Sequence, residues 1–132
     1  MTTELIALAW ALMLAFAHIF AATGARNRET GLAYNAGNRD APGPPVGVVT
    51  GRLQRAQKNF YESLPLFIGA VAIAGLAGKH NAQIELGAWL FFWARLIYLP
   101  IYGFGVPYVR TLVWAAGLVG IGLVLFGALH GA

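Results

Sequence analysis

The chain of 132 residues contains no cysteine. That absence excludes disulfide bonds, thiolate metal sites and a cysteine nucleophile, so any thiol chemistry must use a thiol that a ligand brings. Histidine is scarce as well, and His18, His80 and His130 are isolated, with no second histidine one helical turn away. Because metal sites need several such ligands at suitable spacing, we predict no protein-bound metal.

Charge is the second scarcity. Only 11% of the residues are charged and 58% are hydrophobic, whereas an ordinary soluble domain is about 25% charged. We therefore predict a small integral membrane protein with a single domain over residues 1–132. The net charge of +4 does not indicate nucleic-acid binding, because six of the nine Lys and Arg residues fall between Arg26 and Lys58 and no basic face exists elsewhere.

Four apolar segments are visible, at about residues 3–23, 55–78, 85–102 and 110–129. Each is close to the ~20 residues that a membrane-spanning helix needs. Helix is the form expected in lipid, since every backbone polar group must find a partner within the segment. The second and third connections are short, which makes consecutive helices antiparallel. The sequence thus predicts an all-α, integral membrane, four-helix up-down bundle.

The first connection, residues 24–50, is long, polar and basic. By the positive-inside rule it should lie in the cytoplasm, with both termini on the non-cytoplasmic side. This topology places the start of the second helix, Tyr102 and Arg110 together at the cytoplasmic end. The fourth helix is rich in glycine, which permits close packing either within the bundle or in a homo-oligomer.

A polar stripe runs along the start of the second helix. Arg55, Asn59 and Glu62 have i, i+4, i+7 spacing and share one helix face. An ionisable residue at membrane depth costs roughly 2.5–3.5 kcal/mol and usually faces a bundle interior or a wet cavity. A cation, an amide and an anion on one face predict a site for a zwitterionic polar ligand.

The third helix supplies a second stripe, in which Arg95, Tyr98 and Tyr102 have i, i+3, i+7 spacing. Arg95 and Glu62 are candidates for a structural ion pair, whose loss would leave one charge buried and alone. That interpretation leaves a ligand role for Glu62 open. The two tyrosines have an alternative reading as aromatic residues of the membrane interface.

Arg110 opens the fourth helix, three residues after Pro107. One interpretation is a cytoplasmic anchor. The other is an anion site, because a helix N-terminus adds positive potential and the hydroxyl of Thr111 lies beside the guanidinium. A thiolate would suit such a site.

Three motifs together resemble the MAPEG family, the membrane-associated proteins in eicosanoid and glutathione metabolism. The signature of its second helix is similar to Arg55-Ala-Gln57-Lys-Asn59-x-x-Glu62-x-x-Pro65-Leu-Phe67. Its third helix and the opening of its fourth are similar to Ala94-Arg95-Leu-x-Tyr98-x-x-x-Tyr102 and Pro107-x-x-Arg110-Thr111. The resemblance covers nearly the whole chain in length, helix count and motif placement.

The resemblance implies a homotrimer that binds glutathione between neighbouring protomers near the cytoplasmic face. Arg110 matches the arginine that holds the glutathione thiolate, and Thr111 matches a position that is serine in some relatives; these two are the implied catalytic residues. Ser63 departs from the tyrosine of leukotriene-forming members, and a match for their helix-one arginine stays open between Arg26 and Arg28. The implied glutathione-binding residues are Arg55, Gln57, Asn59, Glu62, Tyr98 and Tyr102.

The implied activity is that of a bacterial-type microsomal glutathione transferase or peroxidase in a bacterial inner membrane. Glutathione would be the co-substrate, and the second substrate would be an apolar, lipid-like electrophile or a lipid hydroperoxide arriving among the membrane lipids. Its identity cannot be read from the sequence. The alternative is a non-catalytic MAPEG-like protein, either lipid-binding or an accessory subunit of a larger membrane complex, because a fold alone does not secure activity.

Overall fold

The computed structural model describes residues 1–130, and within them it is entirely helical, with no strand. The four long helices are each long and apolar enough to cross a membrane, so the predicted all-α membrane bundle is confirmed. The helices are α1 (Thr3–Thr30), α2 (Leu32–Ala36), α3 (Val48–Leu76), α4 (Ala82–Gly103) and α5 (Val109–His130).

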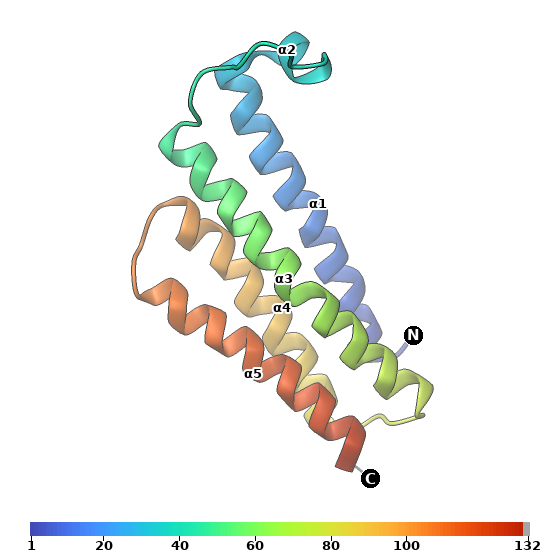
Figure 1. Cartoon of the computed structure of the whole chain (residues 1–132). Coiled ribbons are helices and arrows are strands. Elements are labelled where there is room, and N and C mark those ends of the chain that lie inside the picture. Colours follow the sequence, from blue (N-terminus) through green and yellow to red (C-terminus); the bar gives the residue numbers. More distant parts are fainter. Residues whose placement is uncertain (131–132) are drawn as a thin grey trace.

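The long helices run up-down-up-down (Figure 1). Both chain ends lie at one end of the bundle together with the turn between α3 and α4, and the α1–α3 connection and the α4–α5 turn lie toward the other end. α3 contacts each of the other three long helices, and α4 packs most extensively on α5. Because α3 packs against both α4 and α5, its polar face can meet residues from these two helices.

Two helices are longer than the apolar segments that predicted them. α1 continues to Thr30 and α3 begins at Val48, whereas we expected these boundaries near residues 23 and 55. The extension of α1 is polar and includes an ion pair of 2.8 Å between Arg26 and Glu29, one turn apart. Hydropathy marks only the part of a helix that suits lipid, so it misses the turns that continue into water.

The α1–α3 connection is anchored by hydrogen bonds as well as by the short helix α2. Arg26 donates from Nη2 to the carbonyl oxygen of Pro44 at 2.7 Å, and the backbone N–H of Gly47 donates to Glu29 Oε2 at 2.9 Å. These contacts fold the connection back over the end of α1 and the start of α3, where it forms one wall of a cleft described below.

The core combines stacked aromatic rings with close helix contacts. The ring centroids of Phe67 and Phe91 are 4.2 Å apart, which joins α3 to α4. α4 and α5 approach backbone to backbone, because a Cβ atom on Gly87 would lie only 2.5 Å from the carbonyl oxygen of Gly120. Such approaches need residues without side chains and fix the relative positions of the two helices.

At the end of the bundle that holds the termini, a polar contact joins α1 to the α3–α4 turn. His80 Nδ1 lies 2.6 Å from Glu4 Oε1, and Glu4 is only 1% exposed. The other carboxylate oxygen of Glu4 has no hydrogen-bond partner among the described residues. The imidazole of His80 is therefore the main polar group that compensates this buried carboxyl.

We expect His80→Ala to destabilise the protein by about 1–3 kcal/mol, because it leaves the Glu4 carboxyl buried without its partner. Thermal unfolding in detergent would measure the effect. Combining His80→Ala with Glu4→Gln should recover part of the loss, because the double variant no longer contains the orphaned carboxylate. Stability equal to that of the parent protein in His80→Ala would show that the contact contributes nothing.

Candidate functional site

A cleft of about 320 Å³ lies among α3, α4 and α5, toward the end of the bundle that carries the α4–α5 turn. The sequence had singled out all but one of the residues that line it, although they come from three separate helices. The exception is the tryptophan of α5. The lining residues are Asn59, Tyr98, Tyr102, Arg110, Thr111 and Trp114.

Tyr102 is the centre of this cleft. Its hydroxyl accepts a hydrogen bond from Arg55 Nε at 3.0 Å, and the guanidinium carbon of Arg110 lies 4.6 Å from the centroid of its ring. Tyr98 packs edge-on against Tyr102 with the two centroids 5.6 Å apart. Neither arginine forms an ion pair with a described acidic residue. Arg55 and Arg110 both contact Tyr102, so two positive charges lie close together. This local excess of positive charge favours an anionic ligand.

Arg95 lies behind the cleft and is only 1% exposed. It donates from Nη1 to Asn59 Oδ1 at 2.9 Å, and its guanidinium carbon lies 4.0 Å from the ring centroid of Tyr98. Through these contacts Arg95 fixes the positions of Asn59 and Tyr98, two of the residues that line the cleft. The structure shows no ion pair between Arg95 and Glu62, the two candidates for a structural ion pair.

The reason is the direction in which α3 presents these side chains. Asn59 and Glu62 differ by about 60° around the helix, which is enough to separate an inward residue from an outward one. Asn59 is partly buried against Arg95, and Glu62 is exposed. Arg95 consequently keeps Nε and Nη2 without a described partner.

Gln57 and Glu62 line a different cleft, of about 400 Å³, together with Gln54, Lys58 and Tyr61. The side-chain amide of Gln57 donates to the hydroxyl of Tyr61 at 3.0 Å. Gln57 is about 200° around α3 from Arg55, so the two side chains leave the helix on nearly opposite sides. A single chain thus does not bring Gln57 and Glu62 into the cleft of Arg110.

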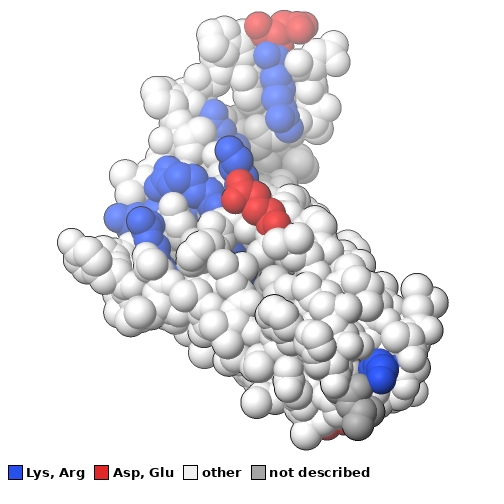
Figure 2. Space-filling view, turned by 60° about the horizontal axis from the view of Figure 1, so that its bottom comes forward, with Lys and Arg blue, Asp and Glu red and all other residues white. Residues whose placement is uncertain are grey.

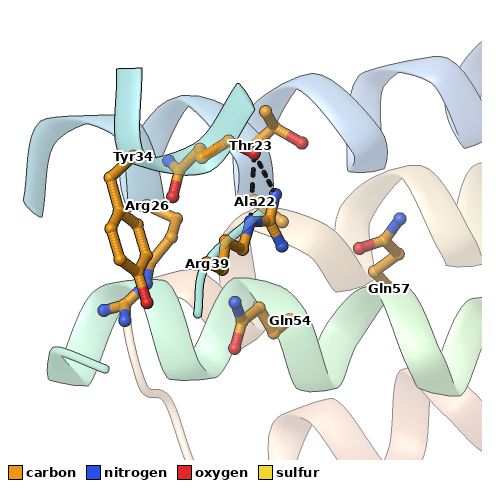
Figure 3. A pocket seen from close by; sticks show the side chains of 8 residues that line it. Ala22, Thr23, Arg26, Tyr34, Arg39, Gln54 and Gln57 are labelled. Atoms are coloured by element: carbon orange, nitrogen blue, oxygen red, sulfur yellow. Dashed lines mark hydrogen bonds between the residues drawn. The ribbon is translucent and has the colours of Figure 1, made fainter. Parts of the chain in front are cut away.

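A third polar cleft, of about 290 Å³, adjoins Gln57 on the side of α1. Figure 3 shows its side chains converging from α1, from the connection and from α3. Arg26 lines this cleft and Arg28 does not, so Arg26 is the α1 arginine that shares a cleft with Gln57. The lining residues are Ala22, Thr23, Arg26, Tyr34, Asn35, Arg39, Gln54 and Gln57.

Arg39 and His18 were not among the predicted site residues. Arg39 reaches the third cleft because the connection folds back, and it donates twice to the carbonyl oxygen of Asn35, at 3.0 and 2.7 Å. His18 is 1% exposed in the middle of α1, with its ring stacked on Phe60 at 4.8 Å. The sequence did indicate that His18 is unusual, because its imidazole lies inside an apolar run. No sequence pattern near Arg39 indicated that it lines a cleft.

The fold and the clefts define an all-helical membrane protein with polar clefts, lined in part by Lys and Arg side chains, gathered toward one end of its bundle. The sequence profile of the MAPEG family matches residues 5–130, and the chain belongs to the MAPEG family. The resemblance noted from the three motifs is thus confirmed. The family includes glutathione transferases and peroxidases as well as other members. A comparison with curated proteins gives no match.

Proposed function

We propose that this protein is a glutathione-dependent membrane transferase or peroxidase that holds the glutathione thiolate against Arg110. The observation that carries the proposal is Tyr102, which lines a cleft with Arg110 and Thr111, lies under the guanidinium of Arg110 and accepts a hydrogen bond from Arg55 beside the cleft. Glutathione offers two carboxylates, an amine and a thiol. The two arginines supply cations for an anionic group, and family membership supplies the class of co-substrate.

Arg110 and the first turn of α5 provide the chemistry. A nearby cation lowers the pKa of a thiol and so raises the fraction present as nucleophilic thiolate. In this proposal the hydroxyl of Thr111, which lines the same cleft, donates a hydrogen bond to the sulfur. In the transferase reaction the thiolate forms a bond to an electrophilic carbon, and the leaving group departs with the electron pair.

In the peroxidase reaction the same thiolate attacks the terminal oxygen of a hydroperoxide and the O–O bond breaks. The alkoxide takes up a proton and leaves as an alcohol, and the glutathione becomes a sulfenic acid. A second glutathione then reduces this sulfenic acid, giving water and glutathione disulfide. Both reactions therefore need the same thiolate at Arg110.

Binding of the whole tripeptide calls for a second copy of the chain, and we propose the homotrimer. Glu62 is exposed on α3, one of the helices long enough to span the membrane. An uncovered carboxylate at that depth is costly, and such groups usually face protein or a wet cavity. In the trimer, a neighbouring copy would cover Glu62 and Gln57 and bring its own Arg110 cleft next to them. Glu62 would then bind the ammonium of glutathione and Gln57 one of its carboxylates.

The second substrate is proposed to be apolar and to arrive from the bilayer. Trp114 lines the cleft, and its side chain is itself exposed on the surface of α5. An apolar molecule in the membrane can thus approach the thiolate along α5 without crossing the polar end of the bundle.

The proposal predicts that glutathione, and more strongly S-hexylglutathione, raises the unfolding temperature of the detergent-purified protein. A ligand at ~100 times its dissociation constant stabilises the folded state by about 2.7 kcal/mol. The shift should disappear in Glu62→Ala and persist in Glu85→Ala, which removes an exposed carboxylate from the opposite end of the bundle. Absence of any shift in the parent protein would contradict the proposal and favour the accessory-subunit alternative.

A further inference from the structure

A separate apolar groove lies between the start of α3 and the end of α4, with a volume of about 370 Å³. It shares no lining residue with the three polar clefts. No charged or amide side chain lines it, so neither glutathione nor another polar solute suits it. The lining residues are Val49, Leu53, Leu99, Pro100, Gly103 and Phe104.

Arg52 is close to this groove, because it precedes the lining residue Leu53 and its guanidinium reaches Gly105, which follows the lining residue Phe104. Its guanidinium rests directly on Gly105 in the α4–α5 turn, where an added Cβ would lie 2.5 Å from Arg52 Cζ. Gly105 also has a positive φ of 75°, so the turn depends on this glycine twice. No hydrogen bond or ion pair joins Arg52 to any other residue between 1 and 130, and the five N–H donors of its side chain stay free.

The depth of Arg52 follows from the length of α4. A helix of 22 residues is about 33 Å long, which matches the ~30 Å hydrocarbon core of a bilayer. The end of α4 and the turn at Gly105 therefore lie at the membrane boundary, at the level of the lipid headgroups. Figure 2 shows Lys and Arg side chains gathered toward this part of the molecule, and most of the positive charge of the chain lies there.

We propose that this groove binds an anionic phospholipid, with one acyl chain against Leu53, Leu99 and Gly103 and the phosphate paired with Arg52. Arginine is well suited to phosphate because two of its N–H groups can donate in parallel. Basic pockets between transmembrane helices at this face of a membrane are recognised sites for anionic headgroups. Free phosphate would leave the apolar groove empty. Arg52 favours a lipid with a net negative charge over phosphatidylcholine, because the choline cation of phosphatidylcholine offsets the charge of its phosphate.

The proposal is tested by native mass spectrometry of the full chain after incubation with phosphatidylglycerol or with phosphatidylcholine of the same acyl chains. The parent protein should retain phosphatidylglycerol in preference. Arg52→Gln should reduce that preference at least about fivefold, the effect of losing one strong charge-assisted contact. Arg28→Gln, which removes an exposed cation from the end of α1, should keep it. Equal preference in the parent and in Arg52→Gln would overturn the proposal.

The acyl-chain half of the site has its own variant. A Cβ on Gly103 would touch only Leu53 Cδ2, at 3.6 Å, so Gly103→Leu should fill the groove without moving the backbone. It should weaken retention of both lipids, whereas unchanged retention would overturn the assignment of the groove. Displacement of phosphatidylglycerol by inorganic phosphate alone would also overturn it, because the acyl chain would then contribute nothing.

A second copy of the chain is the competing occupant of the groove. Because the chain contains no cysteine, Gly103→Cys creates a single thiol for cross-linking in the membrane. Efficient cross-linking between copies through this thiol would show that protein covers the groove and would overturn the proposal. Labelling of Gly103→Cys by a lipid-soluble maleimide, blocked by added phosphatidylglycerol, would support it.

Discussion

Replacing Arg110 with alanine is expected to lower turnover of glutathione with an apolar electrophile about 10²- to 10³-fold, the usual cost of losing one group that stabilises a developing or reacting anion. The dissociation constant for glutathione should change far less, because Tyr102 in the cleft and Arg55 beside it should continue to bind the rest of the molecule. Steady-state kinetics and a separate binding measurement would distinguish the two effects.

Two further variants sharpen this test. Arg110→Lys keeps a cation at the start of α5 and should retain part of the turnover, and Arg28→Ala removes a cation outside the three polar clefts and should change neither quantity. The spectrum of the bound thiolate in the ultraviolet should weaken in Arg110→Ala. Equal losses of turnover and affinity would contradict a role specific to the thiolate.

Gly120→Leu is expected to destabilise the bundle by at least about 3 kcal/mol, at or beyond the usual cost of overpacking. A Cβ on Gly120 would lie 2.6 Å from the carbonyl oxygen of Gly87 and 2.7 Å from the backbone nitrogen of Phe91. Both neighbours are backbone atoms of α4, so the clash cannot be relieved by a change of side-chain rotamer. The whole of α5 must move away from α4.

The matched control is Gly122→Ala on the same helix, because a Cβ there has nothing within 4 Å. It should leave the stability unchanged or raise it by up to about 1 kcal/mol, since alanine favours helix more than glycine does. Unfolding in mixed micelles of a mild detergent and dodecyl sulfate would compare the variants. If Gly120→Leu and Gly122→Ala had equal stability, the close approach of α4 and α5 would be refuted.

The apolar pattern predicted the bounds of a helix well where the whole helix is apolar, and poorly where the helix continues into polar sequence. α5 was expected at residues 110–129 and spans Val109–His130, because apolar sequence and helix coincide there. Helix α1 was expected to end near residue 23, but a hydrogen-bonded backbone does not stop where hydropathy falls. The folding of the connection over α1 depends on contacts such as Arg26 with Pro44, which join residues far apart in the sequence and leave no local pattern.

The site shows the same division. Helical spacing correctly placed Tyr98 and Tyr102 on one face of α4, and their rings do meet. Spacing also grouped Asn59 with Glu62, although only Asn59 meets Arg95. The period of a helix says which residues share a face, but it does not say where along that face a neighbouring helix lies. The packing of the helices determines that position.

The unequal lengths of the helices have a consequence for how reactants meet. α3 has 29 residues and α4 has 22, a difference in length of about 10 Å. α1 and α3 therefore extend beyond α4 and α5 at the end that carries the α1–α3 connection (Figure 1). Arg55, Tyr102 and Arg110 lie near the point where this extension begins, where water and hydrocarbon adjoin. In the proposed reaction, a water-soluble thiol and an oil-soluble acceptor would therefore encounter each other there while each remains in its own solvent, and neither would have to be carried across the boundary.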